Sequence, residues 1–155
     1  MCPTLELEVS CTCFDPRLAL LQVLAHTCEH LSVCKEKLED LEGALYYTRE
    51  SHRILSALGA SHVVQTRRAS VNVAVTISRI VKTHLQQEQY AVALSKILEA
   101  EAIVRCALKE DREALPVLAH VCGLMARCKC RLGDMQGAWA NREEHDMIVE
   151  QISVA

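Results

Sequence analysis

The side chains of this sequence that could do chemistry are mainly its seven histidines and nine cysteines. His26, His30 and Cys34 follow one another at intervals of four residues, which places them on one face of a helix. Imidazole and thiolate groups are zinc ligands, so this spacing could hold part of a metal site. The pair Cys11 and Cys13, however, lacks the two-residue gap and the second pair that are typical of zinc ribbons.

A long internal repeat accounts for many of these residues. Residues 21–45 recur as residues 115–139. The identical pairs include Leu21 and Leu115, Ala25 and Ala119, His26 and His120, Cys28 and Cys122, Cys34 and Cys128, Asp40 and Asp134, and Gly43 and Gly137. Such self-similarity is typical of stacked helical units, each of which buries its apolar face against a neighbour.

The repeat argues against metal chemistry, because His30 is replaced by Leu124 in the second copy. A structural helix explains both copies, and we expect neither a metal nor a cofactor. The cysteines are odd in number and fall within apolar patterns, which favours reduced thiols over disulfides. The sequence also has no nucleophile elbow, glycine-rich phosphate loop or paired catalytic carboxylates, so we predict a protein that is not an enzyme.

Composition favours a single domain of packed helices. Half of the 155 residues are hydrophobic but only 3% are aromatic, with five Gly and three Pro. The net charge of −3 provides no general attraction to nucleic acid or anionic lipid. The N-terminus lacks the features of a signal peptide, and no apolar run approaches the roughly 18 residues of a membrane span. We therefore expect a cytoplasmic protein with neither nucleic acid nor membrane as a partner.

Helical periodicity divides the chain into an irregular tail, residues 1–15, and a helical domain, residues 16–155. Asp15 and Pro16 form a typical helix start, with Asp as the N-cap and Pro in the first turn. The predicted helices are 16–38, 41–58, 63–86, 88–108, one from a start between 111 and 115 to 133, and 135–152. They form three pairs, with units of about 16–60, 61–110 and 111–152.

Gly59 is expected in the left-handed C′ position after the second helix. In the third helix, the residues expected to point inward are Ala69, Val73, Ile77, Ile80 and Val81, and the strand-like alternation of residues 71–75 is outweighed by the helical period on either side.

Each unit carries large and small residues at matching positions. Leu41, Tyr90 and Met135 each stand three residues before an alanine, namely Ala44, Ala93 and Ala138, and the preceding helices carry Leu31, Ile80 and Met125. This pattern resembles the tetratricopeptide repeat, TPR, and residues 58–62 with 72–74 are similar to the kinesin light chain and SET/MYND C-terminal varieties of it. The sequence departs from the family's pattern at its small position, at Val81, and at its packing positions, at Thr48, Ser51, Arg142 and His145. The resemblance implies an all-α fold, a right-handed α-solenoid of three antiparallel helix pairs.

The resemblance also implies that the first helix of each pair lines a concave groove that binds other proteins. The matching residues are His26, Glu29, Lys37, Lys82, Gln86, His120, Arg127 and Arg131. This set is net basic, which favours an acidic partner. We predict a non-enzymatic adaptor or scaffold that binds a peptide or helix of a partner protein in this groove. The alternative is a regulatory or substrate-positioning TPR-like domain of a larger enzyme.

Overall fold

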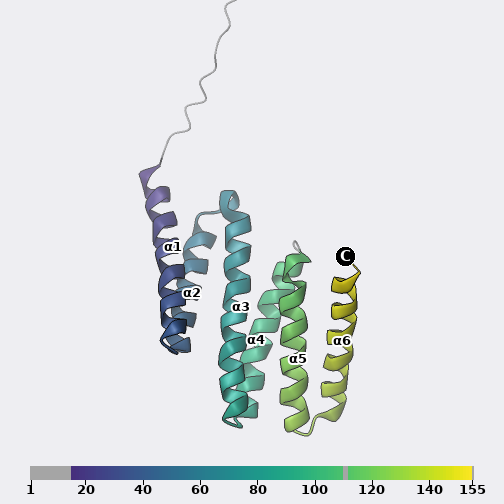
Figure 1. Ribbon diagram of the computed structural model, residues 1–155. Helices are drawn as coiled ribbons and strands as arrows, with labels where there is room; N and C mark the ends of the chain where they lie inside the picture. The colour runs from purple at the N-terminus through teal and green to yellow at the C-terminus, as the bar shows by residue number, and fades with distance from the viewer. Residues whose placement is uncertain (1–14, 110–111, 155) are drawn as a thin grey trace, which may run out of the picture.

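The computed structural model describes residues 15–109 and 112–154, and all regular structure within them is helical (Figure 1). The α-helices are α1 (Pro16–Lys37), α2 (Leu41–Ala57), α3 (Val63–Gln86), α4 (Tyr90–Leu108), α5 (Leu115–Arg131) and α6 (Met135–Ser153), and the short 3₁₀ helices η1 (Ala60–His62) and η2 (Arg112–Ala114) precede α3 and α5. These described residues confirm the all-α class with six α-helices. The predicted tail lies outside them, except for Asp15.

The helix starts follow from local chemistry. The Asp15 carboxylate accepts a hydrogen bond from the Arg17 amide at 2.9 Å, so the predicted N-cap is confirmed. Pro116 lies in the first turn of α5, where its missing N–H leaves no helical hydrogen bond unmade. The strand-like alternation of residues 71–75 lies inside α3, because tertiary packing outweighs the β-propensity of the valines.

The turns between α1 and α2, α3 and α4, and α5 and α6 share one geometry. Each contains a residue of positive φ, and the next amide donates back to a carbonyl near the end of the preceding helix. The positive-φ residues are Glu39, Glu88 and Gly133, and the amide-to-carbonyl pairs are Asp40 to Lys35 at 3.0 Å, Gln89 to His84 at 2.9 Å and Asp134 to Lys129 at 2.9 Å. The repeated sequence therefore produces a repeated turn.

The expectation for Gly59 needs a correction. We expected the left-handed helical conformation after α2, and Gly59 does have a positive φ of 78°. Its ψ of −157°, however, lies far from the left-handed helical value. The reason is that Gly59 leads directly into η1, which begins at the next residue, so the chain extends instead of closing a cap. Only glycine adopts this conformation readily.

Each helix packs against the helix that follows it, and α3 also contacts α5. Helices α1 and α6 therefore lie at opposite ends of the array (Figure 1). Ala44 and Ala93 are fully buried and Ala138 is nearly so, because a small side chain lets neighbouring helices approach closely. No helix in the described part of the chain is both long and apolar enough to cross a bilayer.

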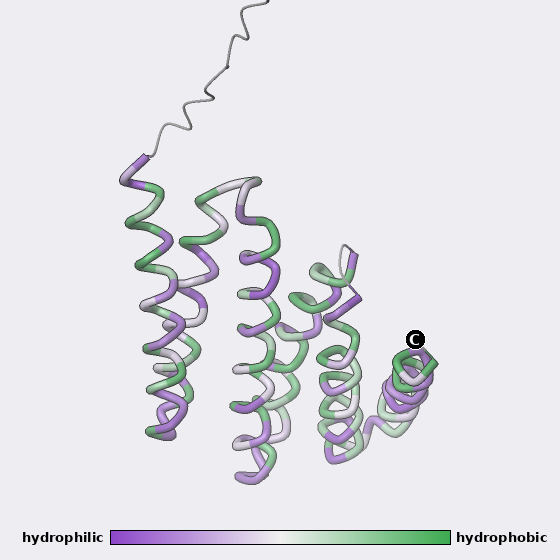
Figure 2. The backbone as a smooth tube through the Cα atoms, turned by 45° about the horizontal axis from the view of Figure 1, so that its top comes forward, coloured by the Kyte–Doolittle hydropathy of each residue, from purple (hydrophilic) through white to green (hydrophobic). Residues whose placement is uncertain are grey.

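The core is formed mainly by α3, α4 and α5. The residues expected to point inward from α3, which are Ala69, Val73, Ile77, Ile80 and Val81, are all buried, so that prediction is confirmed. Helix α1 behaves differently, because hydrophobic residues occur along its whole length although it lies at the end of the array (Figure 2). Leu24, Leu31 and Leu38, which continue its helical apolar pattern, are exposed.

Candidate functional site

The predicted groove residues are divided between two grooves. His26 and Glu29 line a groove of about 440 Å³ bounded by α1, α2 and α3, which we call the first groove. His120, Arg127 and Arg131 line a groove of about 590 Å³ bounded mainly by α5 and α6, which we call the basic groove. The other predicted residues, Lys37, Lys82 and Gln86, are exposed and lie outside both linings.

The two grooves occupy equivalent places in the repeat. His26 and Glu29 of the first groove correspond to His120 and Gly123 of the basic groove. The first groove has α3 as a third wall, and α3 contributes Gln65, Arg68, Ala69, Asn72, Val75, Thr76 and Arg79. The basic groove has only Leu85 and Tyr90 beyond α5 and α6, and is therefore open where the first groove is closed.

The first groove is polar and electrically mixed. At its base, the buried Ser32 hydroxyl donates to the Ala44 carbonyl at 3.0 Å and lies 2.7 Å from the Thr48 hydroxyl. The Thr48 hydroxyl also reaches the Ala44 carbonyl at 2.8 Å, which explains why a polar residue is tolerated at this packing position. On the rim, Arg79 and Glu36 form an ion pair. Both carboxylates of this groove, Glu29 and Glu36, are thus paired within it, whereas Arg68 of the same lining forms no ion pair among the described residues.

The basic groove has a different charge balance. Its lining includes five basic or imidazole side chains and no carboxylate, and it also includes the exposed Trp139 and Met135. The five are His120, Arg127, Arg131, Arg142 and His145. Such a lining combines cationic hydrogen-bond donors with an aromatic surface, a combination that suits an acidic ligand carrying an apolar side chain.

Contacts around the basic groove leave some of its charge available. The Arg131 guanidinium lies 6.0 Å from the centre of the Tyr90 ring, within cation–π range. Asp146, outside the lining, lies 2.8 Å from the His145 imidazole and 3.4 Å from the Arg142 guanidinium. Among the described residues, no carboxylate forms an ion pair with Arg127. Arg131 likewise has no carboxylate ion pair in the described part of the chain, so Arg127 and Arg131 are cations that a ligand can reach without displacing a carboxylate.

His120 connects the basic groove to α3. Its pKa lies below the usual histidine value because the imidazole is partly buried and because Lys82 and His145 lie close by. Because the charge of Lys82 contributes to this shift, Lys82 lies close to the basic groove, although it is not one of the lining residues. The imidazole is therefore biased toward its neutral form, and an anion bound nearby would reverse that bias.

Sequence reasoning missed Trp139, Arg142, His145 and Tyr90 as lining residues of the basic groove. A signal was present for two of them, because Arg142 and His145 were recognised as departures from the packing positions of the repeat. A charged or imidazole side chain at a position that normally packs indicates that the position faces a polar surface. Trp139 gave no such signal, because a large apolar side chain does not by itself indicate exposure at the end of the array.

The histidines and cysteines of the first helix are separate from this site. His26 lies 3.3 Å from the Glu29 carboxylate, while His30 and Cys34 are exposed. Within residues 15–109 and 112–154, no three His, Cys, Asp or Glu side chains are arranged to hold a metal ion. Burial raises the pKa of the Cys122 thiol to about 12, with Glu144 adding to the effect, so this thiol is not an activated nucleophile.

Comparison with known proteins adds no relative: no family model, no curated protein and no solved structure matches this chain.

Proposed function

We propose that this chain is a TPR-like protein-binding module and not an enzyme. Its six helices form a right-handed α-solenoid of three antiparallel pairs. The sequential packing of the helices, the recurring turn and the buried Ala44 and Ala93 at helix contacts support this arrangement. As an adaptor or scaffold, the module binds a peptide or helix of a partner protein on the side presented by α1, α3 and α5.

The single observation that carries the proposal is the absence of carboxylates from the lining of the basic groove, which contains three arginines and two histidines. Guanidinium groups bind carboxylate and phosphate oxygens through paired hydrogen bonds, so the ligand is an acidic or phosphorylated segment. Trp139 and Met135 provide an apolar surface for one large side chain of the same segment. Lys82, close to His120, adds to the positive field.

The first experiment measures binding of fluorescein-labelled acidic and phosphorylated peptides by fluorescence anisotropy. Each peptide contains one Trp or Leu and has a matched peptide in which Gln replaces the acidic residues. We expect the acidic set to bind and the Gln set not to bind. Affinity should fall as salt rises, because ions screen exposed charges over a Debye length of about 10 Å.

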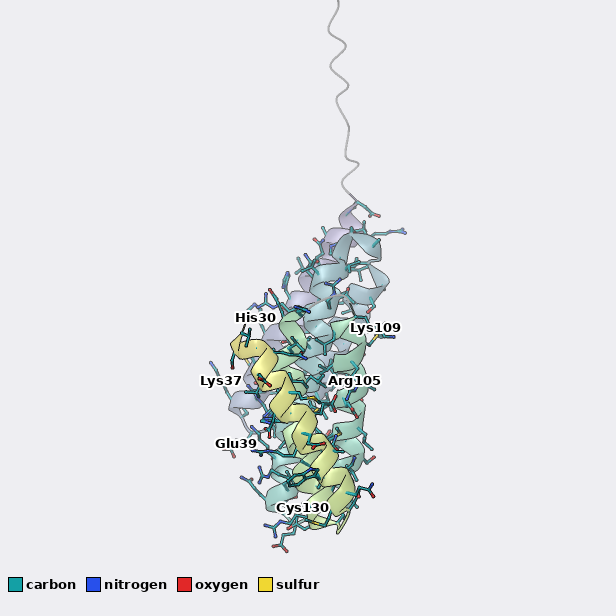
Figure 3. All side chains as sticks on the ribbon, turned by 90° about the vertical axis from the view of Figure 1, so that its right-hand side faces the viewer. His30, Lys37, Glu39, Arg105, Lys109 and Cys130 are labelled. Carbon is teal, nitrogen blue, oxygen red and sulfur yellow. The ribbon has the colours of Figure 1, made fainter. Side chains whose placement is uncertain are left out.

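The double variant Lys82→Glu with Arg127→Glu should abolish this binding while helicity is retained, because both side chains are exposed. The matched control, Arg49→Glu with Arg105→Glu, changes the net charge equally but alters residues that pair with Glu99 and Glu144 on other helices. Figure 3, viewed from the α6 side, places Arg105 across the array from His30 and Lys37. Loss of binding in the control variant alone would put the site on the face of α2 and α4.

A further inference from the structure

The exposed apolar face of α1 repeats a face that is buried in α3 and α5. Leu20, Leu24 and Leu31 are 69%, 47% and 39% exposed, and Thr27, between Leu24 and Leu31, and Cys34, after Leu31, are also exposed. These residues are spaced alternately by four and three, so they form one continuous stripe along the helix. The Thr27 hydroxyl is already satisfied by the Val23 carbonyl at 2.8 Å, so it does not make the stripe strongly polar.

Aligning the repeats shows what the equivalent residues of this stripe contact in α3 and α5. The equivalents in α3 are Ala69, Val73, Thr76 and Ile80, and in α5 and the residue before it Ala114, Leu118, Val121, Met125 and Cys128. All of these are buried, whereas Thr83, the α3 equivalent of Cys34, is half-buried. Helix α3 packs against α2, and α5 packs against α4, so in both cases the stripe meets the second helix of the preceding pair.

Helix α6 presents residues equivalent to those with which α2 contacts the stripe of α3. In α2, Leu45 and Leu55 belong to the same hydrophobic clusters as Val73 and Ala69 of α3, respectively. The equivalents of these two leucines in α6 are Trp139 and Val149, which are 70% and 42% exposed. Met135, the equivalent of Leu41, is also exposed. Arg142 interrupts this face, but Asp146 lies 3.4 Å away and offsets its charge.

The open side of the basic groove lies along the same face. In the first groove, α3 supplies the third wall through Ala69 and Thr76, which are equivalents of Leu20 and Thr27 in α1. The wall missing from the basic groove is therefore one that a helix with the α1 stripe would complete. Helices α1 and α6 lie at opposite ends of the array, so one molecule cannot make this contact with itself (Figure 1).

We propose that the α1 stripe of one copy docks on α6 of a second copy, and thereby repeats between molecules the contact that α3 makes with α2 and α5 makes with α4. This interface is heterologous, so each molecule uses one face to bind the next and the copies assemble head to tail. The contacts within the chain favour a second copy as the occupant: the same apolar contact occurs twice, between α2 and α3 and between α4 and α5, and α1 and α6 each retain one half of it.

The assembly is tested with two blocked variants. Leu20→Glu with Leu24→Glu places charges on the α1 stripe, and Trp139→Glu with Val149→Glu places them on α6. The controls are Val33→Glu and Met147→Glu, which alter side chains that are also exposed but lie off the two faces, since the equivalents of Val33 are the exposed Lys82 and Arg127 and the equivalent of Met147 is the exposed Arg53. Circular dichroism checks that every variant keeps its helicity.

Sedimentation velocity should show that the wild-type protein and both controls associate as concentration rises, whereas each blocked variant stays monomeric. An equimolar mixture of the two blocked variants should form a heterodimer, because each supplies the face that the other lacks. A wild-type protein that is monomeric at every concentration overturns the proposal. So does continued self-association of the α6 variant, which would indicate a symmetric contact between two α1 helices. The measurement uses no ligand, so its result is independent of the binding proposed above. Docking covers Trp139, so within the assembly an acidic ligand contacts Trp139 only in the copy whose α6 is left free.

Discussion

Helix α5 buries Leu118 and Met125 in the main hydrophobic cluster, whereas α1 leaves their equivalents Leu24 and Leu31 exposed. The two helices carry the same repeat, so the difference does not come from residue type. It comes from neighbours, because α5 has the α3–α4 pair on one side and α6 on the other, while α1 packs chiefly on α2. In a stacked array, burial therefore depends on place in the stack as much as on local sequence.

The two grooves differ in the same way. The first groove is closed by three helices, and its hydroxyls and ion pairs satisfy one another. The basic groove lacks the third wall, and its arginines outnumber nearby carboxylates. Repetition thus provides two similar cavities, and the end of the array leaves one of them with charge available to a ligand.

The largest effect that would sharpen this comparison is on stability. Met125→Ala should lower the free energy of unfolding by about 2–5 kcal/mol, because it leaves a cavity around a side chain that is 1% exposed. Leu31→Ala, its equivalent in α1, should cost less than about 1 kcal/mol, because much of that side chain is already in water. Urea denaturation at low protein concentration measures both. Equal losses of unfolding free energy would show that Leu31 contributes as much packing in α1 as Met125 does in α5.

The helices themselves were predictable, and their environments less so. The predicted α3 span of 63–86 matches the structure, because a helical pattern bounded by recognisable ends depends on local sequence. The exposure of Leu20 and Trp139 was not predictable, since both are apolar and apolar residues at equivalent positions, such as Ala69 and Leu45, are buried. Of the predicted groove residues, Arg127 and His120 lie together in the basic groove, whereas Lys37 lies outside it. Their division between two grooves depends on the three-dimensional stack.

The next effect concerns the alanines at the helix contacts. Ala44→Leu and Ala93→Leu should each destabilise the fold by about 1–3 kcal/mol, because both sites are fully buried and a larger side chain overpacks them. Ala138→Leu should cost less, because Ala138 is 8% exposed and α6 has a neighbour on only one side. Thermal unfolding of the three variants compares them. Unchanged midpoints in all three would remove the proposed TPR register.

Cysteine reactivity gives a smaller but more local measure of the difference in burial between α1 and α5. Cys34 of α1 is exposed, whereas its equivalent Cys128 in α5 is buried and burial raises the pKa of its thiol. Iodoacetamide should therefore modify Cys34 at least about tenfold faster than Cys128, since the thiolate is the nucleophile and the buried thiol needs local opening. Mass spectrometry of digested samples follows each site. In denaturant the two rates should converge, and equal rates in the native protein would contradict the burial of this α5 face.

The smallest effect is a titration shift in the basic groove. Lys82 is one of the groups that hold the pKa of His120 below its usual value, after partial burial of the imidazole itself. Lys82→Gln should therefore raise that pKa, because it removes a positive charge that disfavours the imidazolium. Two-dimensional NMR of the imidazole resonances follows the titration. His52 is the control, because burial alone lowers its pKa and the substitution should leave it unchanged.

The lowered pKa of His120 also determines how stability depends on pH. Because the folded-state pKa of His120 is depressed, its neutral form adds stability above the unfolded pKa of about 6.5, and this contribution is lost as pH falls through the folded value. His120→Gln should therefore slightly flatten the loss of stability on acidification, whereas a bound acidic peptide should raise the His120 pKa and oppose that loss. A His120 titration that is unchanged by Lys82→Gln would separate Lys82 from the basic groove, and one that is unchanged by the bound peptide would contradict binding of the peptide in that groove.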